Sequence, residues 1–165
     1  MRILGIDPGL DITGYGVIDD KGGNPVLIEA GIIRSSSKDP FTDRLHSIYY
    51  QIDDLIKQAK PDLCAIEQLY SHYKHPMTAI LMGHARGVVL LCCRNSNIEI
   101  VGYPAKTVKR AVTGNGNASK MQVKRVVQGY FNIKDNENPV DVTDALALGL
   151  THIYHAKLDK ELVRA

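Results

Sequence analysis

The chain has 165 residues, an apolar fraction of 44% and no low-complexity tract, which together predict a single globular domain over residues 1–165. Its net charge is only +2, and its longest apolar run, Val88 to Cys93, is far shorter than the roughly 20 residues of a membrane span, so we expect no membrane contact. Three cysteines, two of them adjacent, exclude a disulfide framework, and the apolar stretch that ends at Asp7 is too short for a signal sequence, so we expect a cytoplasmic protein.

The first half of the chain predicts three strands, a helix and a fourth strand. Apolar runs at residues 2–7, 13–18 and 26–34 are separated by short turn-like segments, which predicts an antiparallel meander. A helix follows over residues 41–59, where apolar residues recur on one face and Lys60-Pro61 stops the pattern. The next strand covers residues 62–67, and the intervening helix favours a parallel pairing with the first strand.

The second half predicts mainly helices. A helix over residues 76–94 leads to a fifth strand at 98–101, and further helices are expected near 104–112, 120–131 and 139–156. This order predicts an α/β protein with a mixed five-stranded sheet, an antiparallel meander plus parallel strands, flanked by helices on both faces. The arrangement matches the ribonuclease-H-like nuclease architecture.

Four carboxylates carry the strongest functional signal. Asp7 and Glu67 end the first and fourth predicted strands, which parallel pairing brings to the same edge of the sheet. Asp141 and Asp144 share one face at the start of the last predicted helix. Burying several like charges is costly unless a cation neutralises them, and carboxylate oxygens are preferred ligands of Mg²⁺ and Mn²⁺. The four acids therefore predict a metal site for phosphoryl transfer, because helix capping accounts for Asp141 alone.

Positive charge gathers in the middle of the chain. Residues 68–134 contain ten lysines or arginines and one acid, a charge of +9, whereas the rest of the chain carries −7. Such a block predicts a nucleic-acid-binding face, although a solvated helical surface shows the same pattern.

Lys120 is the most distinctive member of this basic block. Ser119 and Gln122 form a capping box that places Lys120 in the first turn of a helix. A cation there opposes the helix dipole, but a lysine at a helix N-terminus suits a phosphate group. Lys124 and Arg125 continue the same helix, and we expect them to contact phosphate.

Five segments of the chain carry a family resemblance: Ile3 to Gly9, Thr13 to Ile18, Ala65 to Gln68, Gly83 to Gly87 and Asp141 to Ala147. In this order and spacing, over residues 3 to about 155, they resemble the bacterial Holliday-junction resolvase family RuvC. The first segment alone also resembles the opening of sugar-kinase and actin-like ATPases, but those enclose their nucleotide between two such domains, and 165 residues are too few.

The resemblance implies a homodimeric, Mg²⁺-dependent endodeoxyribonuclease that cuts four-way DNA junctions symmetrically during DNA recombination and repair. It also implies a bacterial, nucleoid-associated enzyme that works with the RuvA–RuvB branch-migration complex. The family's catalytic and metal-binding acids match Asp7, Glu67, Asp141 and Asp144, with two Mg²⁺ ions per subunit and Mn²⁺ as a substitute. Its two important lysines match Lys109 and Lys120, and the aromatic residue after the catalytic Glu matches Tyr70, which we expect to stack on a base.

Other interpretations remain for several of these features. A nuclease of the same fold that acts on RNA or RNA–DNA hybrids would need the same acids, and a non-catalytic DNA-binding module would share the basic block. Tyr70 and the neighbouring Tyr73 could simply pack beneath their loop, and an exposed Lys109 could serve only solubility. We interpret His152 as structural or as a group behind the metal ligands, because about three helical turns separate it from Asp141.

Overall fold

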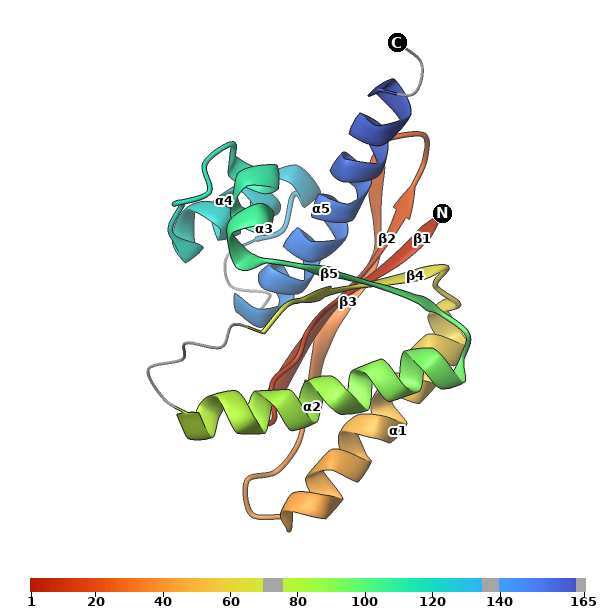
Figure 1. The fold of residues 1–165 in the computed structure, drawn as a ribbon, viewed down its shortest axis with the longest axis vertical. Helices are drawn as coiled ribbons and strands as arrows, with labels where there is room; N and C mark the ends of the chain where they lie inside the picture. Colours follow the sequence, from red (N-terminus) through yellow and green to blue (C-terminus); the bar gives the residue numbers. More distant parts are fainter. Residues whose placement is uncertain (70–75, 135–139, 163–165) are drawn as a thin grey trace.

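Among the described residues, five strands form one mixed sheet in the order β3-β2-β1-β4-β5 (Figure 1). The structure is a computed structural model that describes residues 1–69, 76–134 and 140–162. The first three strands pair antiparallel, whereas β4 pairs parallel with both β1 and β5, as the sequence predicts. The strands are β1 (Arg2–Asp7), β2 (Ile12–Asp20), β3 (Pro25–Arg34), β4 (Leu63–Glu67) and β5 (Glu99–Tyr103).

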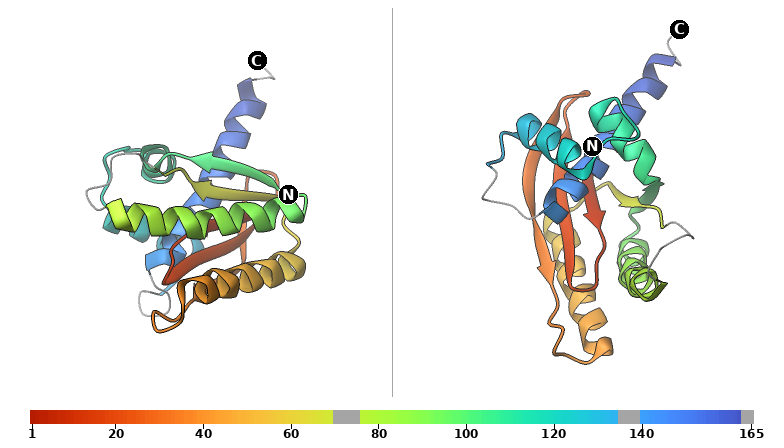
Figure 2. Two further views of the ribbon diagram at one scale, coloured as in Figure 1. Left: turned by 60° about the horizontal axis from the view of Figure 1, so that its bottom comes forward. Right: turned by 90° about the vertical axis from the view of Figure 1, so that its left-hand side faces the viewer.

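In the part of the chain that the structure describes, five helices cover both faces of this sheet, which confirms the predicted layers (Figures 1 and 2). Helices α1 and α2 lie on one face, and α5 crosses the other face with α3 and α4 packed on its outer side. Successive residues of β1 alternate between the two resulting cores, Ile3 towards α5 and Leu4 towards α1 and α2. The helices are α1 (Phe41–Ala59), α2 (Pro76–Asn95), α3 (Ala105–Thr113), α4 (Lys120–Phe131) and α5 (Val140–Leu162).

Helix α5 approaches β1 and β2 so closely at two positions, Gly5 and Gly14, that only glycine fits there. A Cβ atom added to Gly5 would lie 2.0 Å from the carbonyl oxygen of Ala145, and one added to Gly14 would lie 2.0 Å from that of Asp141. The outer side of α5 is covered by α3 and α4, so Ala147, which lines the pocket between these helices, is also almost fully buried. The start of α5 is therefore fixed directly above the sheet.

Strand β5 and helix α5 are among the elements that extend beyond their predicted ends. Strand β5 continues to Tyr103, whose backbone pairs with Glu67 and whose side chain is buried. Helix α5 continues to Leu162 rather than ending near residue 156, because no proline or glycine interrupts this segment.

Helix α2 is the one helix among the described residues that is long and apolar enough to cross a membrane by length and composition alone. Ala85, Val89, Cys92 and Cys93 bury one side of α2 in the core, a pattern that a core helix of a globular domain also shows.

Candidate active site

Asp7 and Glu67 end two neighbouring parallel strands. The pairing of β1 with β4 runs to Ile6 opposite Ile66, so the two acidic residues follow at the same edge of the sheet. The turn after Asp7 is closed by Thr13, whose hydroxyl donates to the Gly9 carbonyl at 2.8 Å and accepts from the Gly9 amide at 3.2 Å. The first two predicted site residues are therefore placed as expected.

Asp141 and Asp144 reach the same edge through the first turns of α5. Gly14 is the residue that brings them there, because it pairs with Asp7 across β1 and β2 and also lies against the backbone of Asp141. Asp144 follows one turn later, and its charge raises the pKa of both strand-end acids, Asp7 and Glu67. Three elements that are distant in the chain thus assemble one acidic cluster.

Burial and mutual repulsion raise the pKa values of three of these acids. Burial, followed by the charges of Asp144 and Glu67, raises the pKa of Asp7 to about 7, although Lys120 opposes the rise. Burial also raises the pKa of Glu67 and, against the pull of Lys120, the pKa of Asp144. The cluster therefore favours any positive charge that reaches it.

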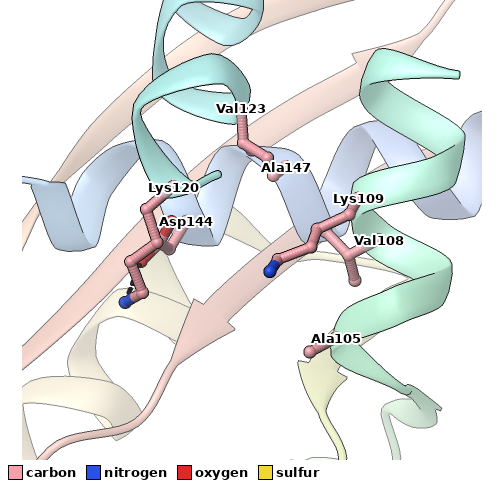
Figure 3. Close-up of a pocket in the computed structure, with 7 residues that line it drawn as sticks. All are labelled: Ala105, Val108, Lys109, Lys120, Val123, Asp144 and Ala147. Carbon is pink, nitrogen blue, oxygen red and sulfur yellow. Dashed lines mark hydrogen bonds and ion pairs between the residues drawn. The ribbon is translucent and has the colours of Figure 1, made fainter. Parts of the chain in front are cut away.

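Lys120 supplies one such charge. Its Nζ lies 3.2 Å from Oδ2 of Asp144 (Figure 3), and this carboxylate raises the pKa of Lys120. The predicted capping box is present, since the Ser119 hydroxyl accepts from the Gln122 amide and the Gln122 side chain accepts from the Ser119 amide. The lysine side chain remains 77% exposed, so a phosphate group can reach the ammonium.

Lys109 points from α3 towards the same space (Figure 3). It lines a pocket between α3, α4 and α5, and its charge lowers the pKa of both Glu67 and Asp144, opposing their rise. The remaining lining is mainly apolar: Ala105, Val108, Val123 and Ala147, with Lys120 and Asp144 at its polar end. The two lysines that the resemblance selected therefore converge on the acids from two different helices.

The donor atoms of the cluster suit a hard cation. Among the residues that the structure describes, no three His, Cys, Asp or Glu side chains converge closely enough in this arrangement to hold an ion. The four acids nevertheless offer only carboxylate oxygens, and their mutual repulsion is what a divalent cation would relieve. The residues therefore fit a hard divalent metal.

The other predicted site residues lie further away or outside the described part of the chain. Lys124 and Arg125 lie one turn beyond Lys120 on α4, where Arg125 is exposed. Tyr70 and Tyr73 lie outside the described residues. Their predicted contacts with DNA stay predictions.

His152 contacts Tyr103 of β5, which does not separate the structural interpretation from a role behind the metal ligands. A hydrogen bond of 2.8 Å links its Nδ1 to the hydroxyl of Tyr103, and burial lowers the pKa of His152. Tyr103 pairs with Glu67 across β4 and β5, so this contact supports the strand end that carries the acid.

Reasoning from the sequence missed two supports of the site. Gly14 has no signal of its own, because a glycine in a strand also marks bulges and turns. Gln68 is exposed, but its side chain donates to the Gly102 carbonyl at 3.0 Å and its amide donates to the Tyr103 carbonyl at 2.9 Å. Both contacts depend on strand register, which the sequence does not state.

The fold and the sequence both have clear relatives. Residues 3–152 match the family described as "Crossover junction endodeoxyribonuclease RuvC". The chain is 44% identical over 154 residues to the protein of that name from Rhodopirellula baltica, covering 93% of this chain and 86% of the relative. The corresponding protein from Caldicellulosiruptor saccharolyticus is 40% identical, with coverage of 93% and 92%.

A solved structure agrees with this assignment. The chain is 29% identical to T. thermophilus RuvC in complex with a Holliday junction substrate, with a TM-score of 0.88 and coverage of 96% of each chain. The predicted ribonuclease-H-like fold is thereby confirmed. With its sheet, its acids and its lysines in these positions, the chain belongs to the RuvC family of crossover junction endodeoxyribonucleases.

Proposed function

We propose that this protein resolves four-way DNA junctions by symmetric, Mg²⁺-dependent hydrolysis of two phosphodiester bonds. The observation that carries the proposal is the acidic cluster formed by β1, β4 and α5 with two lysines beside it. The complex of T. thermophilus RuvC with a Holliday junction supports the choice of substrate.

Asp7, Glu67, Asp141 and Asp144 would hold the metal, which we propose to be two Mg²⁺ ions per subunit, replaceable by Mn²⁺. When bound, such ions supply an activated water and stabilise the leaving oxygen. The raised pKa values of Asp7, Glu67 and Asp144 mean that these acids retain protons more readily before a metal arrives. The acids therefore exchange protons for metal, and binding should strengthen with pH.

Lys120 and Lys109 would act on the phosphate being cut. Both ammonium groups border the acidic cluster, and Lys120 already bonds to Asp144. A cation held at this edge can offset negative charge as it develops on the phosphate. Lys124 and Arg125, one turn further along α4, would instead hold neighbouring phosphates, with Tyr70 stacking on a base at the junction centre.

The exposed side of α2 supports a homodimer. Ile80 and Leu91 are 51% and 54% exposed, and their spacing of three helical turns places them on one face. Gly87 lies on the same face, and a Cβ atom added there would meet no atom within 4 Å. A close helix-to-helix contact between two subunits would bury this apolar strip and give the two active sites that symmetric cutting requires.

The cellular setting follows from the substrate. We place the protein in the bacterial cytoplasm, at the nucleoid, where it would act with the RuvA–RuvB branch-migration complex in recombination and repair. These partners would deliver the junction whose two strands the dimer cuts.

Substrate choice separates this function from its nearest alternative. The purified protein with Mg²⁺ should cut a synthetic four-way junction and leave matched duplex DNA and an RNA–DNA hybrid intact. Preferential cutting of the hybrid would instead identify a nuclease of the same fold with a different substrate.

A further inference from the structure

The backbone of Glu67 lacks one hydrogen bond that the sheet would normally supply. The Gln68 amide donates towards β5, so the amide and carbonyl of Glu67 point the other way, towards β1. Given the pairing of Ile6 with Ile66, the next donor to the Glu67 carbonyl would be the backbone nitrogen of residue 8. That residue is Pro8, which has no amide hydrogen.

Arg86 of α2 occupies the place of this missing donor. Its Nε donates to the Glu67 carbonyl oxygen at 3.1 Å, in a partly buried position. Ala85 and Val89, both 0% exposed, fix this part of α2 against the core and thus fix where the guanidinium group begins.

The end of β4 is therefore held from both sides. Gln68 bonds to β5 through its amide and its side chain, and Arg86 bonds to the Glu67 carbonyl on the side of β1. The side chain of Glu67 is therefore attached to a backbone segment that hydrogen bonds hold on both sides. Loss of either bond would allow the acid to move relative to Asp7.

We propose that Arg86 is the positioning residue for Glu67, because its guanidinium replaces the backbone hydrogen bond that Pro8 cannot make. The role deepens the proposed metal-dependent function, since Glu67 is one of the four acids. It differs from a contact between Arg86 and DNA, which the position of the residue in the basic block would also suggest.

The first test compares Arg86→Met with Arg94→Met. Methionine keeps an apolar stem but has no N–H donor, and Arg94 is an exposed arginine of the same helix. Hydrogen exchange of the amides of residues 66–69 should become faster in Arg86→Met alone. Mn²⁺ affinity, measured by calorimetry without DNA, should fall about 10- to 100-fold in Arg86→Met, while junction affinity in Ca²⁺ stays unchanged.

Unchanged hydrogen exchange and unchanged Mn²⁺ affinity, with a loss of junction affinity at low salt, would make Arg86 a phosphate contact and overturn the proposal. If the unaltered protein bound no Mn²⁺, the metal-dependent function would fail, whereas the exchange result would still decide the role of Arg86.

A second test restores the donor from the other side. Pro8→Ala returns an amide hydrogen at residue 8, so Arg86→Met should reduce Mn²⁺ affinity less in the Pro8→Ala protein than in the unaltered one. If Arg86→Met lowered Mn²⁺ affinity equally in both proteins, residue 8 and Arg86 would act independently. That result would overturn the idea that Arg86 replaces the donor missing at Pro8.

Discussion

Replacing Gly14 by alanine should separate the two halves of the active site without unfolding the protein. The added Cβ would lie 2.0 Å from the carbonyl oxygen of Asp141, whereas ordinary contacts begin at 3.4 Å. The start of α5 must therefore retreat by about 1.4 Å, and displacements of this size cost roughly 100-fold in rate. At about 1.4 kcal/mol for each factor of ten, the barrier rises by about 2.8 kcal/mol.

The assay is single-turnover cleavage of a four-way junction by saturating Gly14→Ala protein in Mg²⁺, at a temperature where urea titration shows full folding. Overpacking should also lower the free energy of unfolding, by about 1–3 kcal/mol. Gly129→Ala is the matched control, because its new methyl group meets no atom within 4 Å and lies in α4. Cleavage by Gly14→Ala within twofold of the unaltered rate would refute the idea that close approach of α5 sets the geometry.

Three further predictions concern charge and assembly. Without metal, the raised pKa of Asp7 means that the folded state holds a proton which the unfolded state has lost, so stability should fall from about pH 4 to pH 7. Asp7→Asn should reduce this slope, to which the raised pKa values of Glu67 and Asp144 also contribute, and should abolish cutting but not junction binding. Calorimetric unfolding across pH checks this, and an unchanged slope would contradict it. Lys120→Ala should slow single-turnover cleavage at saturating protein, whereas Lys124→Ala should weaken binding and flatten its dependence on log salt by about one unit; a normal Lys120→Ala rate would reduce that lysine to docking. Ile80→Glu should convert a dimer to a monomer in light scattering, and a monomeric unaltered protein would refute the α2 contact.

Local patterns in the sequence were enough to predict the strands, the layers and the four acids. Apolar runs that end in Asp7 and Glu67 encode strand ends directly, and the spacing of Asp141 and Asp144 encodes a shared helix face. The convergence of Lys109 with Lys120 followed from family resemblance alone, because two helices set it through tertiary packing.

Other features of the site lie beyond such patterns. The role of Gly14 depends on how closely α5 approaches β2, and the bond from Arg86 depends on which carbonyl the sheet leaves without a donor. Pro8 is the one sequence signal for the Arg86 bond, because proline has no amide hydrogen. Its meaning is clear only when the register of β1 and β4 is known.

The long crossing of α5 over the sheet also bears on synthesis of the chain. Residues of α5 such as Leu146, Leu150 and Ile153 cover one face of the sheet, and the same helix brings Asp141 and Asp144. A nascent chain that has not yet reached residue 140 therefore lacks both the cover of that face and half of its acids. A chain that stops before α5 would therefore carry neither the complete core nor the complete acidic cluster, because one helix supplies both.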